Sequence, residues 1–456
     1  MRSRRNHELV LLTFAAAITS GAYALATLGR TASIPADLLP FLGVVFGLLL
    51  FAHLVIRRVA PDADPTILPV VALLNGLGYV FIARLANDID DAAALPGQQA
   101  TWTAVGIAAF TATLLLVPRI KVLDKYRYLA AITGLGLLVM PLLPGIGREF
   151  NGARIWVSIG PINFQPGEFA KIALAVFVAS YLAEKREVLE QSRLKFGPLR
   201  LPEPKHLAPV LAAWGASLLV MIWEKDLGSS LLIFLVVVVM LWVATGRLSY
   251  LATGMALFVA GSWVTSRQFA HVQDRLDIWL DPFADPDGRG FQPIEASFAL
   301  ANGGLTGTGP GRGEPFRIPE VETDFIYAAI GEELGLVGSV GILIAFVVML
   351  TTGLRIAIGT RDDFGKLLAT ALSALIGIQA FIIIGGVIRI VPLTGITLPF
   401  VSYGGSSLVA NYVLVALLIR ISQDGARRPD LRGSSTDGSD DDESSDGSRT
   451  AIAEPA

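Results

Sequence analysis

The sequence predicts an all-α polytopic membrane protein, a helical bundle of about twelve transmembrane helices, and three observations support this fold class. Of the 456 residues, 53% are hydrophobic and only 16% are charged, whereas soluble domains average about 25% charged residues. Apolar runs of the ~20 residues that cross a bilayer recur along most of the chain. Lys and Arg collect in every second connection between these runs, as is typical of cytoplasmic loops.

Composition excludes several classes of function. The 36 Lys and Arg against 39 Asp and Glu give a net charge of -3, which argues against a basic protein that binds nucleic acid. The absence of cysteine excludes disulfides, thiol catalysis and Cys-ligated metals. The four histidines lie far apart in the sequence, so no His-rich metal site is predicted.

The apolar runs predict the transmembrane helices in order. No small-residue cleavage site follows the first run, which is therefore predicted to be a retained span rather than a signal peptide. The runs lie near residues 8–28, 36–56, 66–85, 99–117, 128–144, 168–183, 207–223, 228–246, 248–266, 325–353, 367–387 and 406–421.

The connections predict the orientation. Basic residues precede the first run and follow the second, fourth, sixth and tenth runs, whereas the connection after the third run contains the acids of 87–91 and no Lys or Arg. Both termini are therefore predicted to be cytoplasmic. The acidic Ser- and Gly-rich tail, 422–456, is predicted to be disordered, as a solubilising end or a regulatory segment.

Four polar segments, 145–167, 224–229, 267–324 and 388–405, are predicted to face the other side. In the first, Trp156 fits either an interfacial residue or a site residue. Glu168 and Lys171 are three residues apart at the start of the next span, where they can pair on one helix face. A cation just inside the bilayer is costly and is usually paired or functional.

The second and third segments carry further polar candidates. Asp226 fits a helix N-cap, although it belongs to a charged cluster between two spans. The segment 267–324 is a long loop rich in glycine at 303–313, where backbone amides could cradle an anion, or which could be a flexible connection. Arg312 and Arg317 nearby bring the anion-binding interpretation level with that of a flexible loop.

Acidic residues accompany the entry to the next span. Asp324 lies at its start and is a candidate N-cap, with Thr323 as the rival cap. Glu332 and Glu333 follow within the predicted helix and are expected to lie ~12–14 Å deeper. Two adjacent acids inside a span are either functional or paired within the bundle.

The fourth segment, 388–405, combines Pro, Gly and hydroxyl residues next to apolar spans. Irregular backbone at membrane depth is tolerated where it packs on protein or lines a wet cavity. Ser402 and Ser406 are candidate polar contacts, and Ser406 could also cap the last helix. The segments together predict an outward-facing polar cavity for an anionic lipid, without deciding between its transport and its reaction.

These residues resemble the SEDS family of shape, elongation, division and sporulation proteins, to which RodA, FtsW and SpoVE belong. The resemblance covers residues 125–421 and follows six motifs in order. The motifs are Gly152, Trp156, Gln165-Pro166, Glu168 and Lys171; Asp226-Leu227-Gly228-Ser229; Trp279-Leu280-Asp281-Pro282; Pro319-Glu320 with Thr323-Asp324-Phe325; Glu332-Glu333-Leu334-Gly335; and Pro392-Leu393-Thr394-Gly395 with Leu398-Pro399-Phe400 and Ser402 to Ser407.

The resemblance implies a peptidoglycan glycosyltransferase of the bacterial cytoplasmic membrane that polymerises lipid II on the outer face. It implies a class B penicillin-binding protein as partner, with other elongation or division proteins, and Mg²⁺ or Mn²⁺ as a candidate cofactor. It also implies N-terminal spans at 1–124, a catalytic core at 125–421 and an appended tail. The short tail and the lack of a long outer insertion favour an elongation role over division.

The resemblance places the essential acid at Asp324 and the important tryptophan at Trp156. Glu168, Lys171 and Asp226 match polar positions of the family's cavity, and Arg154 stands one place earlier than the family's usual arginine. The hypothesis is that Asp324 acts as general base, with Lys171 and Arg154 among the cations that stabilise the pyrophosphate leaving group, together with Arg312 and Arg317. Alternatives are a lipid II flippase, or a non-catalytic membrane scaffold.

Overall fold

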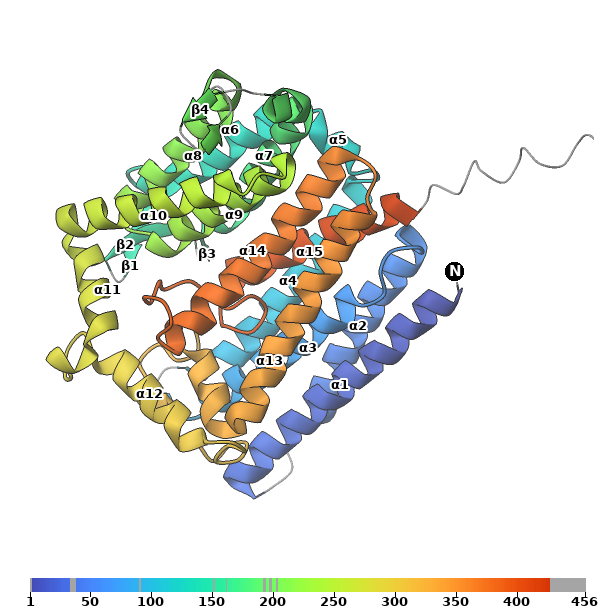
Figure 1. The fold of residues 1–456 in the computed structure, drawn as a ribbon. Coiled ribbons are helices and arrows are strands. Elements are labelled where there is room, and N and C mark those ends of the chain that lie inside the picture. Colours follow the sequence, from blue (N-terminus) through green and yellow to red (C-terminus); the bar gives the residue numbers. More distant parts are fainter. Residues whose placement is uncertain are drawn as a thin grey trace, which may run out of the picture.

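The structure is a computed structural model, and the described part of the chain is mostly helical (Figure 1). Twelve helices coincide with the twelve predicted spans, so the prediction of an all-α polytopic membrane protein is confirmed. The predicted tail lies outside the described residues from 427 onward, while 422–426 continue the last helix. The structure describes residues 2–32, 38–89, 92–150, 152–160, 162–191, 194–196, 199–201 and 204–426.

Nine of these helices are long and apolar enough to cross a membrane within the described residues. They are α1 (Arg2–Thr31), α3 (Ile67–Leu85), α4 (Leu95–Leu116), α7 (Pro166–Gln191), α8 (Pro204–Glu224), α9 (Leu227–Thr245), α13 (Ile326–Gly359), α14 (Asp363–Val387) and α15 (Gly405–Ala426). The other three predicted spans are the helices α2 (Leu38–Val59), α6 (Arg127–Val139) and α10 (Ser249–Gln268).

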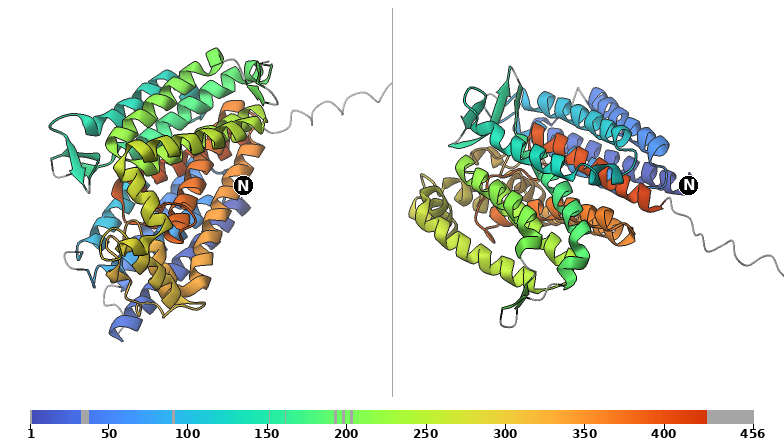
Figure 2. Two further views of the ribbon diagram at one scale, coloured as in Figure 1. Left: turned by 60° about the vertical axis from the view of Figure 1, so that its left-hand side comes forward. Right: turned by 90° about the horizontal axis from the view of Figure 1, so that it is seen from above.

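The long polar segments are more regular than the sequence suggests. Residues 145–167 hold an antiparallel sheet of β1 (Gly147–Phe150), β2 (Ala153–Ile159) and β3 (Ile162–Phe164), which projects from the helices in Figure 2. Residues 267–324, predicted as a loop, contain α11 (Ala270–Leu280) and α12 (Phe291–Gly303). The remaining short elements are α5 (Lys121–Asp124), β4 (Leu194–Phe196), β5 (Leu199–Leu201), η1 (Met140–Leu142), η2 (Pro282–Ala284) and η3 (Pro315–Arg317).

Side-chain contacts bring the predicted basic connections together at one end of the bundle, here called the basic end. Arg4 donates to the carbonyl of Asp62, whose backbone amide donates to Gln423 at 2.7 Å. Lys121 pairs with Asp362 at 3.1 Å. Figure 1 shows the start of α1 and the end of α15 at this same end. The opposite end, which carries α11, α12 and the sheet β1–β3, is called the pocket end.

Helix α13 contains a reversal that the sequence analysis did not predict. Gly335 adopts φ 65° and ψ -164°, and this left-handed backbone favours glycine. Tyr327 donates from its hydroxyl to the carbonyl of Ser339 at 3.2 Å, whereas a straight helix would separate these residues by ~18 Å. Residues 326–334, here called the half-helix, therefore run toward the pocket end before the chain turns back through the bundle.

The reversal corrects the expected depth of the two acids. Glu333 pairs with Arg84 at 2.8 Å, and Arg84 lies in the last turn of α3, a helix that begins near the basic end. Glu332 and Glu333 thus lie at the pocket end rather than deeper along a straight span. The error arose because a glycine inside an apolar run gives only a weak signal for a break.

Candidate active site

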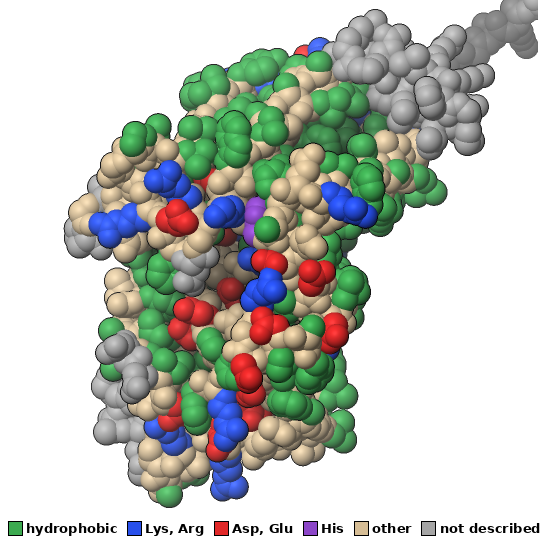
Figure 3. Space-filling view, turned by 90° about the vertical axis from the view of Figure 1, so that its left-hand side faces the viewer, with side chains coloured by type: hydrophobic (Ala, Val, Ile, Leu, Met, Phe, Trp, Pro, Cys, Tyr) green, Lys and Arg blue, Asp and Glu red, His purple; other side chains and the backbone are tan. Residues whose placement is uncertain are grey.

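A cavity of about 330 Å³ opens at the pocket end. Figure 3 shows the corresponding face of the molecule as a hollow with basic and acidic side chains around it. Helices α11, α12 and α14, the segment before α13 and the irregular segment 389–396 build its walls. Its polar lining residues are Arg275, Trp279, Arg289, Gln292, Asp324, Arg389 and Thr394.

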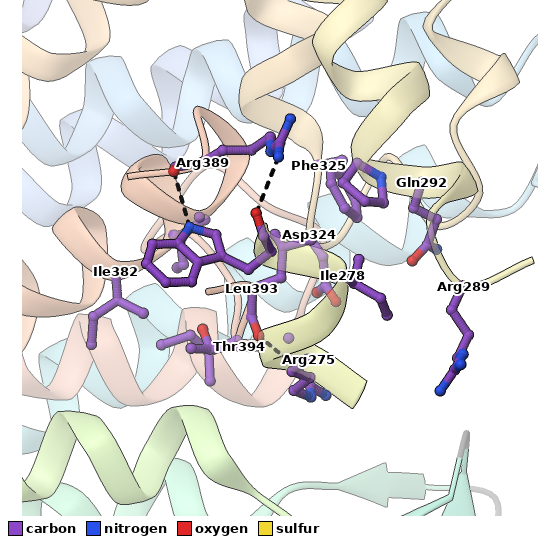
Figure 4. Close-up of a pocket in the computed structure, with 16 residues that line it drawn as sticks. Arg275, Ile278, Arg289, Gln292, Asp324, Phe325, Ile382, Arg389, Leu393 and Thr394 are labelled. Atoms are coloured by element: carbon purple, nitrogen blue, oxygen red, sulfur yellow. Dashed lines mark hydrogen bonds between the residues drawn. The ribbon is translucent and has the colours of Figure 1, made fainter. Parts of the chain in front are cut away.

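Asp324 is the carboxylate of this cavity (Figure 4). It lies two residues before the half-helix, and its side chain remains partly accessible. Burial raises the pKa of the Asp324 carboxyl to about 6, while a hydrogen bond from Thr323 and the positive charge of Arg275 limit the rise. A carboxylate with a pKa near neutral pH suits proton transfer in either direction.

Ser402 fixes the segment that carries Asp324. Its hydroxyl donates to the carbonyl of Thr323 and accepts from the backbone amide of Leu398 at 2.9 Å. A second tie joins the same segments, because the amide of Tyr403 donates to the carbonyl of Glu322 at 2.8 Å. Ser402, a predicted site residue, therefore supports the acid through the backbone and does not line the cavity.

Three arginines line the same cavity. Arg275 donates to the carbonyl of Leu393 at 2.8 Å, and burial lowers the pKa of its guanidinium, against the opposing effect of Asp324 and Asp226. Trp279 donates to the carbonyl of Arg389 at 3.0 Å, and Arg389 donates back to the carbonyl of Trp279 at 3.1 Å. Arg289 is more exposed and pairs with Asp274.

Gly395 lets Asp324 and Arg275 face the same space. Its φ is 72°, a conformation that side chains rarely adopt. A Cβ at this position would lie 3.6 Å from Asp324 Oδ2 and 3.6 Å from Arg275 Nη2. The glycine of the Pro392-Leu393-Thr394-Gly395 motif thus keeps the space between Asp324 and Arg275 open.

A buried polar network supports the segment 394–397 from the bundle side. Lys171 pairs with Glu168 at 2.6 Å and donates to Gln379 at 2.8 Å. Gln379 donates in turn to the carbonyl of Thr397 at 2.8 Å. Glu168 and Lys171 therefore form the predicted pair, and through Gln379 they contact the backbone that forms one wall of the cavity.

Asp226 has the predicted N-cap geometry, because its carboxylate accepts from the amide of Ser229 at 2.9 Å. Burial raises the pKa of its carboxyl, and the neighbouring charges that act on it are Glu168 and Arg275. The following Gly228 packs so closely that a Cβ would lie 3.0 Å from the carbonyl oxygen of Thr394. The cap therefore lies between the Glu168 pair and the cavity.

The remaining predicted residues lie outside the cavity lining. Trp156 and Arg154 are both in β2, where Trp156 pairs with Arg148 of β1 and Arg154 is exposed. Ser406 accepts from the amide of Gln165 at 2.9 Å, which joins the end of β3 to the start of α15. Arg317 pairs with Glu314, and Arg312 is exposed next to α1.

The glycine-rich segment 303–313 directs several of its backbone amides to the two glutamates of the half-helix. The Glu333 carboxylate accepts from the amide of Gly311 at 2.8 Å, and Glu332 accepts from the amide of Glu314 at 3.2 Å. Two further amides, of Thr308 and Gly309, donate to the carbonyls of these glutamates. The segment thus packs on the half-helix rather than offering its amides to a phosphate.

Sequence reasoning missed the three arginines of the cavity. Arg275 precedes Trp279 by four residues on α11, so both project from one helix face, and that spacing was a usable signal. Arg389 precedes the Pro392 motif and has an unusual φ of 61°, which the sequence does not reveal. The site therefore combines one carboxylate with three guanidinium groups, an arrangement suited to a hydroxyl nucleophile and an anionic leaving group.

Comparisons with known proteins find a matching family model and several similar relatives. A family model described as cell cycle protein, FtsW/RodA/SpoVE, matches residues 65–426. The peptidoglycan glycosyltransferase RodA of Mycobacterium bovis is 48% identical over 434 residues, which cover 94% of this chain and 92% of the relative. Stage V sporulation protein E of Bacillus subtilis is 32% identical over 372 residues, 80% of this chain and 98% of the relative.

The fold is also similar to a solved one. A chain from a structure on the coordination of polymerization and crosslinking by a peptidoglycan synthase complex superposes with a TM-score of 0.65 and 27% sequence identity. The match covers 80% of this chain and 99% of the other.

Proposed function

This chain belongs to the FtsW, RodA and SpoVE family of cell cycle proteins, and from that premise we propose how it acts. It is a multi-pass membrane protein and a RodA-like peptidoglycan glycosyltransferase that serves cell shape. In the proposed reaction it polymerises lipid II into glycan strands at the outer face of the cytoplasmic membrane. The basic end then faces the cytoplasm with both termini, as the Lys and Arg distribution favours.

The proposed mechanism assigns the general base to Asp324. Its carboxylate takes the proton of the 4-hydroxyl on the GlcNAc of the acceptor lipid II. The oxygen forms a bond to the anomeric carbon of the growing chain as the bond from that carbon to the pyrophosphate oxygen breaks, which inverts the anomeric centre. The observation that supports this assignment is the partly accessible carboxyl with a pKa of about 6 in a cavity lined by arginines.

The leaving group is undecaprenyl pyrophosphate, whose charge needs stabilisation rather than protonation. Arg275, Arg289 and Arg389 line the cavity, and guanidinium groups bind phosphate oxygens with two parallel hydrogen bonds. Positive charge placed where negative charge develops is usually the largest contribution to such catalysis. These arginines replace Arg154, Arg312 and Arg317 as the proposed phosphate ligands. Lys171 does not line the cavity and instead supports its wall through Gln379.

The proposal includes a divalent cation, Mg²⁺ or Mn²⁺, that accompanies the reaction. Among the described residues, no group of three or more His, Asp or Glu side chains could hold a metal. The cavity offers Asp324 beside guanidinium groups, whereas these ions prefer several oxygen ligands. The residues present therefore do not fit a resident ion, and one that accompanies the reaction would bind mainly to the pyrophosphate oxygens.

The proposed partner is a class B penicillin-binding protein, which would cross-link the strands made here, alongside other elongation proteins. The matching solved chain comes from a peptidoglycan synthase complex, and this supports the proposal. Co-purification from membranes with one such transpeptidase is the expected result. Recovery of the chain without any transpeptidase would count against it.

The decisive test is polymerisation by the purified full-length protein. With Asp324→Asn, we expect the ladder of glycan products from lipid II to fall by ~10²–10⁴-fold, the usual contribution of a positioned base. Glu322→Gln, two residues earlier in the same segment, is the matched control and should keep the ladder. An Asp324→Asn protein that polymerises at the parent rate would refute the assignment.

The same preparation distinguishes the alternatives of a flippase and a scaffold. A flippase would move lipid II between the leaflets of vesicles without forming a ladder, and a scaffold would do neither. The cavity lies at one end of the bundle rather than midway, which favours the enzyme over a transporter with a central site.

A further inference from the structure

The first helix of the chain precedes the residues that the family model matches. The match begins at residue 65, and α1 ends at Thr31. The C-terminal end of α1 nevertheless contacts the glycine-rich segment 303–313 through backbone atoms. A Cβ on Gly29 would lie 2.0 Å from the carbonyl oxygen of Pro310, and a Cβ on Gly311 would lie 2.1 Å from the carbonyl oxygen of Ala26. No side chain fits between α1 and this segment.

A chain of ion pairs continues this contact inward. Arg30 of α1 pairs with Asp88 at 2.6 Å, and Asp88 also pairs with Arg84. Arg84 donates to Glu333 at 2.8 Å and to the carbonyl of Gly313 at 2.7 Å. The Arg84 and Glu333 side chains are 3% and 1% exposed. Their ion pair is therefore shielded from solvent, and dissolved salt screens the attraction between the two charges only weakly.

Glu333 lies in the last turn of the half-helix, and Asp324 lies just before its first residue. Nine residues separate the two acids, or ~14 Å at the helical rise. The half-helix is buried along its length, and a Cβ on Gly303 of α12 would lie 1.9 Å from the carbonyl oxygen of Gly331. A displacement at Glu333 is therefore transmitted to Asp324 rather than absorbed, since packed interiors are poorly compressible.

From these contacts we infer that α1 and Arg84 position the general base. The outer end of α1 holds the glycine-rich segment, Arg84 and that segment hold Glu333, and the half-helix sets the place of Asp324. Arg84 is thus a positioning residue that acts through Glu333, and α1 is part of the active-site framework. This inference rests on the proposed role of Asp324.

The test inserts a side chain between α1 and the segment. Gly29→Val is expected to lower kcat for lipid II polymerisation by roughly 10- to 100-fold, because ~1 Å of misplacement costs about 10²-fold. The KM for lipid II should stay within about twofold, since the arginines remain in place. Gly21→Val is the matched control on the same helix, where a Cβ meets nothing within 4 Å, and it should match the parent.

A second pair of variants guards against a simple loss of folded protein. Arg84→Ala should lower kcat per folded molecule, and Arg84→Lys, which keeps the charge toward Glu333, should restore part of it. Each rate is normalised to the protein that unfolds cooperatively in a thermal melt. In the Gly29→Val and Arg84→Ala variants the acid limb of the pH–rate profile should also move from the parent midpoint, because Asp324 changes its surroundings.

The outcomes separate the two hypotheses. If Gly29→Val and Gly21→Val polymerise alike, or if activity falls only in proportion to folded protein, the positioning role is refuted. If instead Asp324→Asn retains full activity, the base assignment fails whatever the α1 variants do.

Discussion

The charge of Arg275 should control the pH at which the enzyme loses activity. Asp324 must be ionised to accept a proton, so kcat/KM for lipid II should fall as the pH drops through about 6. One pH unit below this midpoint, only about a tenth of the carboxyl groups are ionised, and the rate should be roughly tenfold lower. The perturbation is Arg275→Gln, which removes a positive charge that favours the ionised form.

The size of the shift follows from the geometry at Gly395. Asp324 Oδ2 and Arg275 Nη2 both lie 3.6 Å from the position of a Cβ there, so they are at most about 7 Å apart. Unit charges at that separation interact by roughly 2.4 kcal/mol at an effective dielectric constant of about 20. Since one pKa unit corresponds to about 1.4 kcal/mol, this interaction corresponds to ~1.7 units. Water in the open cavity reduces this, and we expect the midpoint to rise by about one unit.

The assay measures initial rates of lipid II polymerisation between pH 4.5 and 8 at constant ionic strength. Arg289→Gln is the matched control, because it removes the same charge from the same cavity lining. The native Arg289 side chain pairs with Asp274 and Asp285 rather than with Asp324. Its midpoint should remain near the parent value even if its KM rises. An unchanged or lowered midpoint in Arg275→Gln would refute the proposed coupling of the two side chains.

Two other substitutions test the support of the site. Ser402→Ala removes a hydroxyl that bonds both Leu398 and Thr323, and it should lower the free energy of unfolding by roughly 1–3 kcal/mol for each group left unsatisfied, read from thermal melts in detergent. Lys171→Met leaves the carboxylate of Glu168 buried without its partner and should lower the free energy of unfolding by about 3–5 kcal/mol. The double variant with Glu168→Gln should be clearly more stable than the single variant. Equal melting temperatures of the two variants would contradict the pairing.

The spans were predictable because hydrophobic runs of membrane length have few structural alternatives. Each of the twelve runs falls on a helix. The strands at 147–164 were not predicted, because very short strands separated by Gly and Pro carry little periodic signal. The reversal at Gly335 was also missed, since its cause is the tertiary contact with 305–307.

The site was predictable where a local pattern determines the chemistry. Asp226 as a cap and the pairing of Glu168 with Lys171 follow from sequence spacing, and the structure confirms both. The roles of Arg312 and Arg317 stay predictions without support from the cavity, because the sequence does not show which loop charges face inward. Arg275 and Arg389 reach the cavity from segments more than 100 residues apart. The Arg275 side chain donates to the carbonyl of Leu393, and the Arg389 side chain donates to the carbonyl of Trp279.

The turn at Gly335 means that residues 326–334 do not cross the bundle. The stretch that bears Asp324 and the half-helix enters and leaves the bundle at the pocket end, as a re-entrant stub between α12 and the long arm of α13. Because both ends of this stub lie at one end of the bundle, Asp324 reaches its cavity without any part of the stub extending to the basic end.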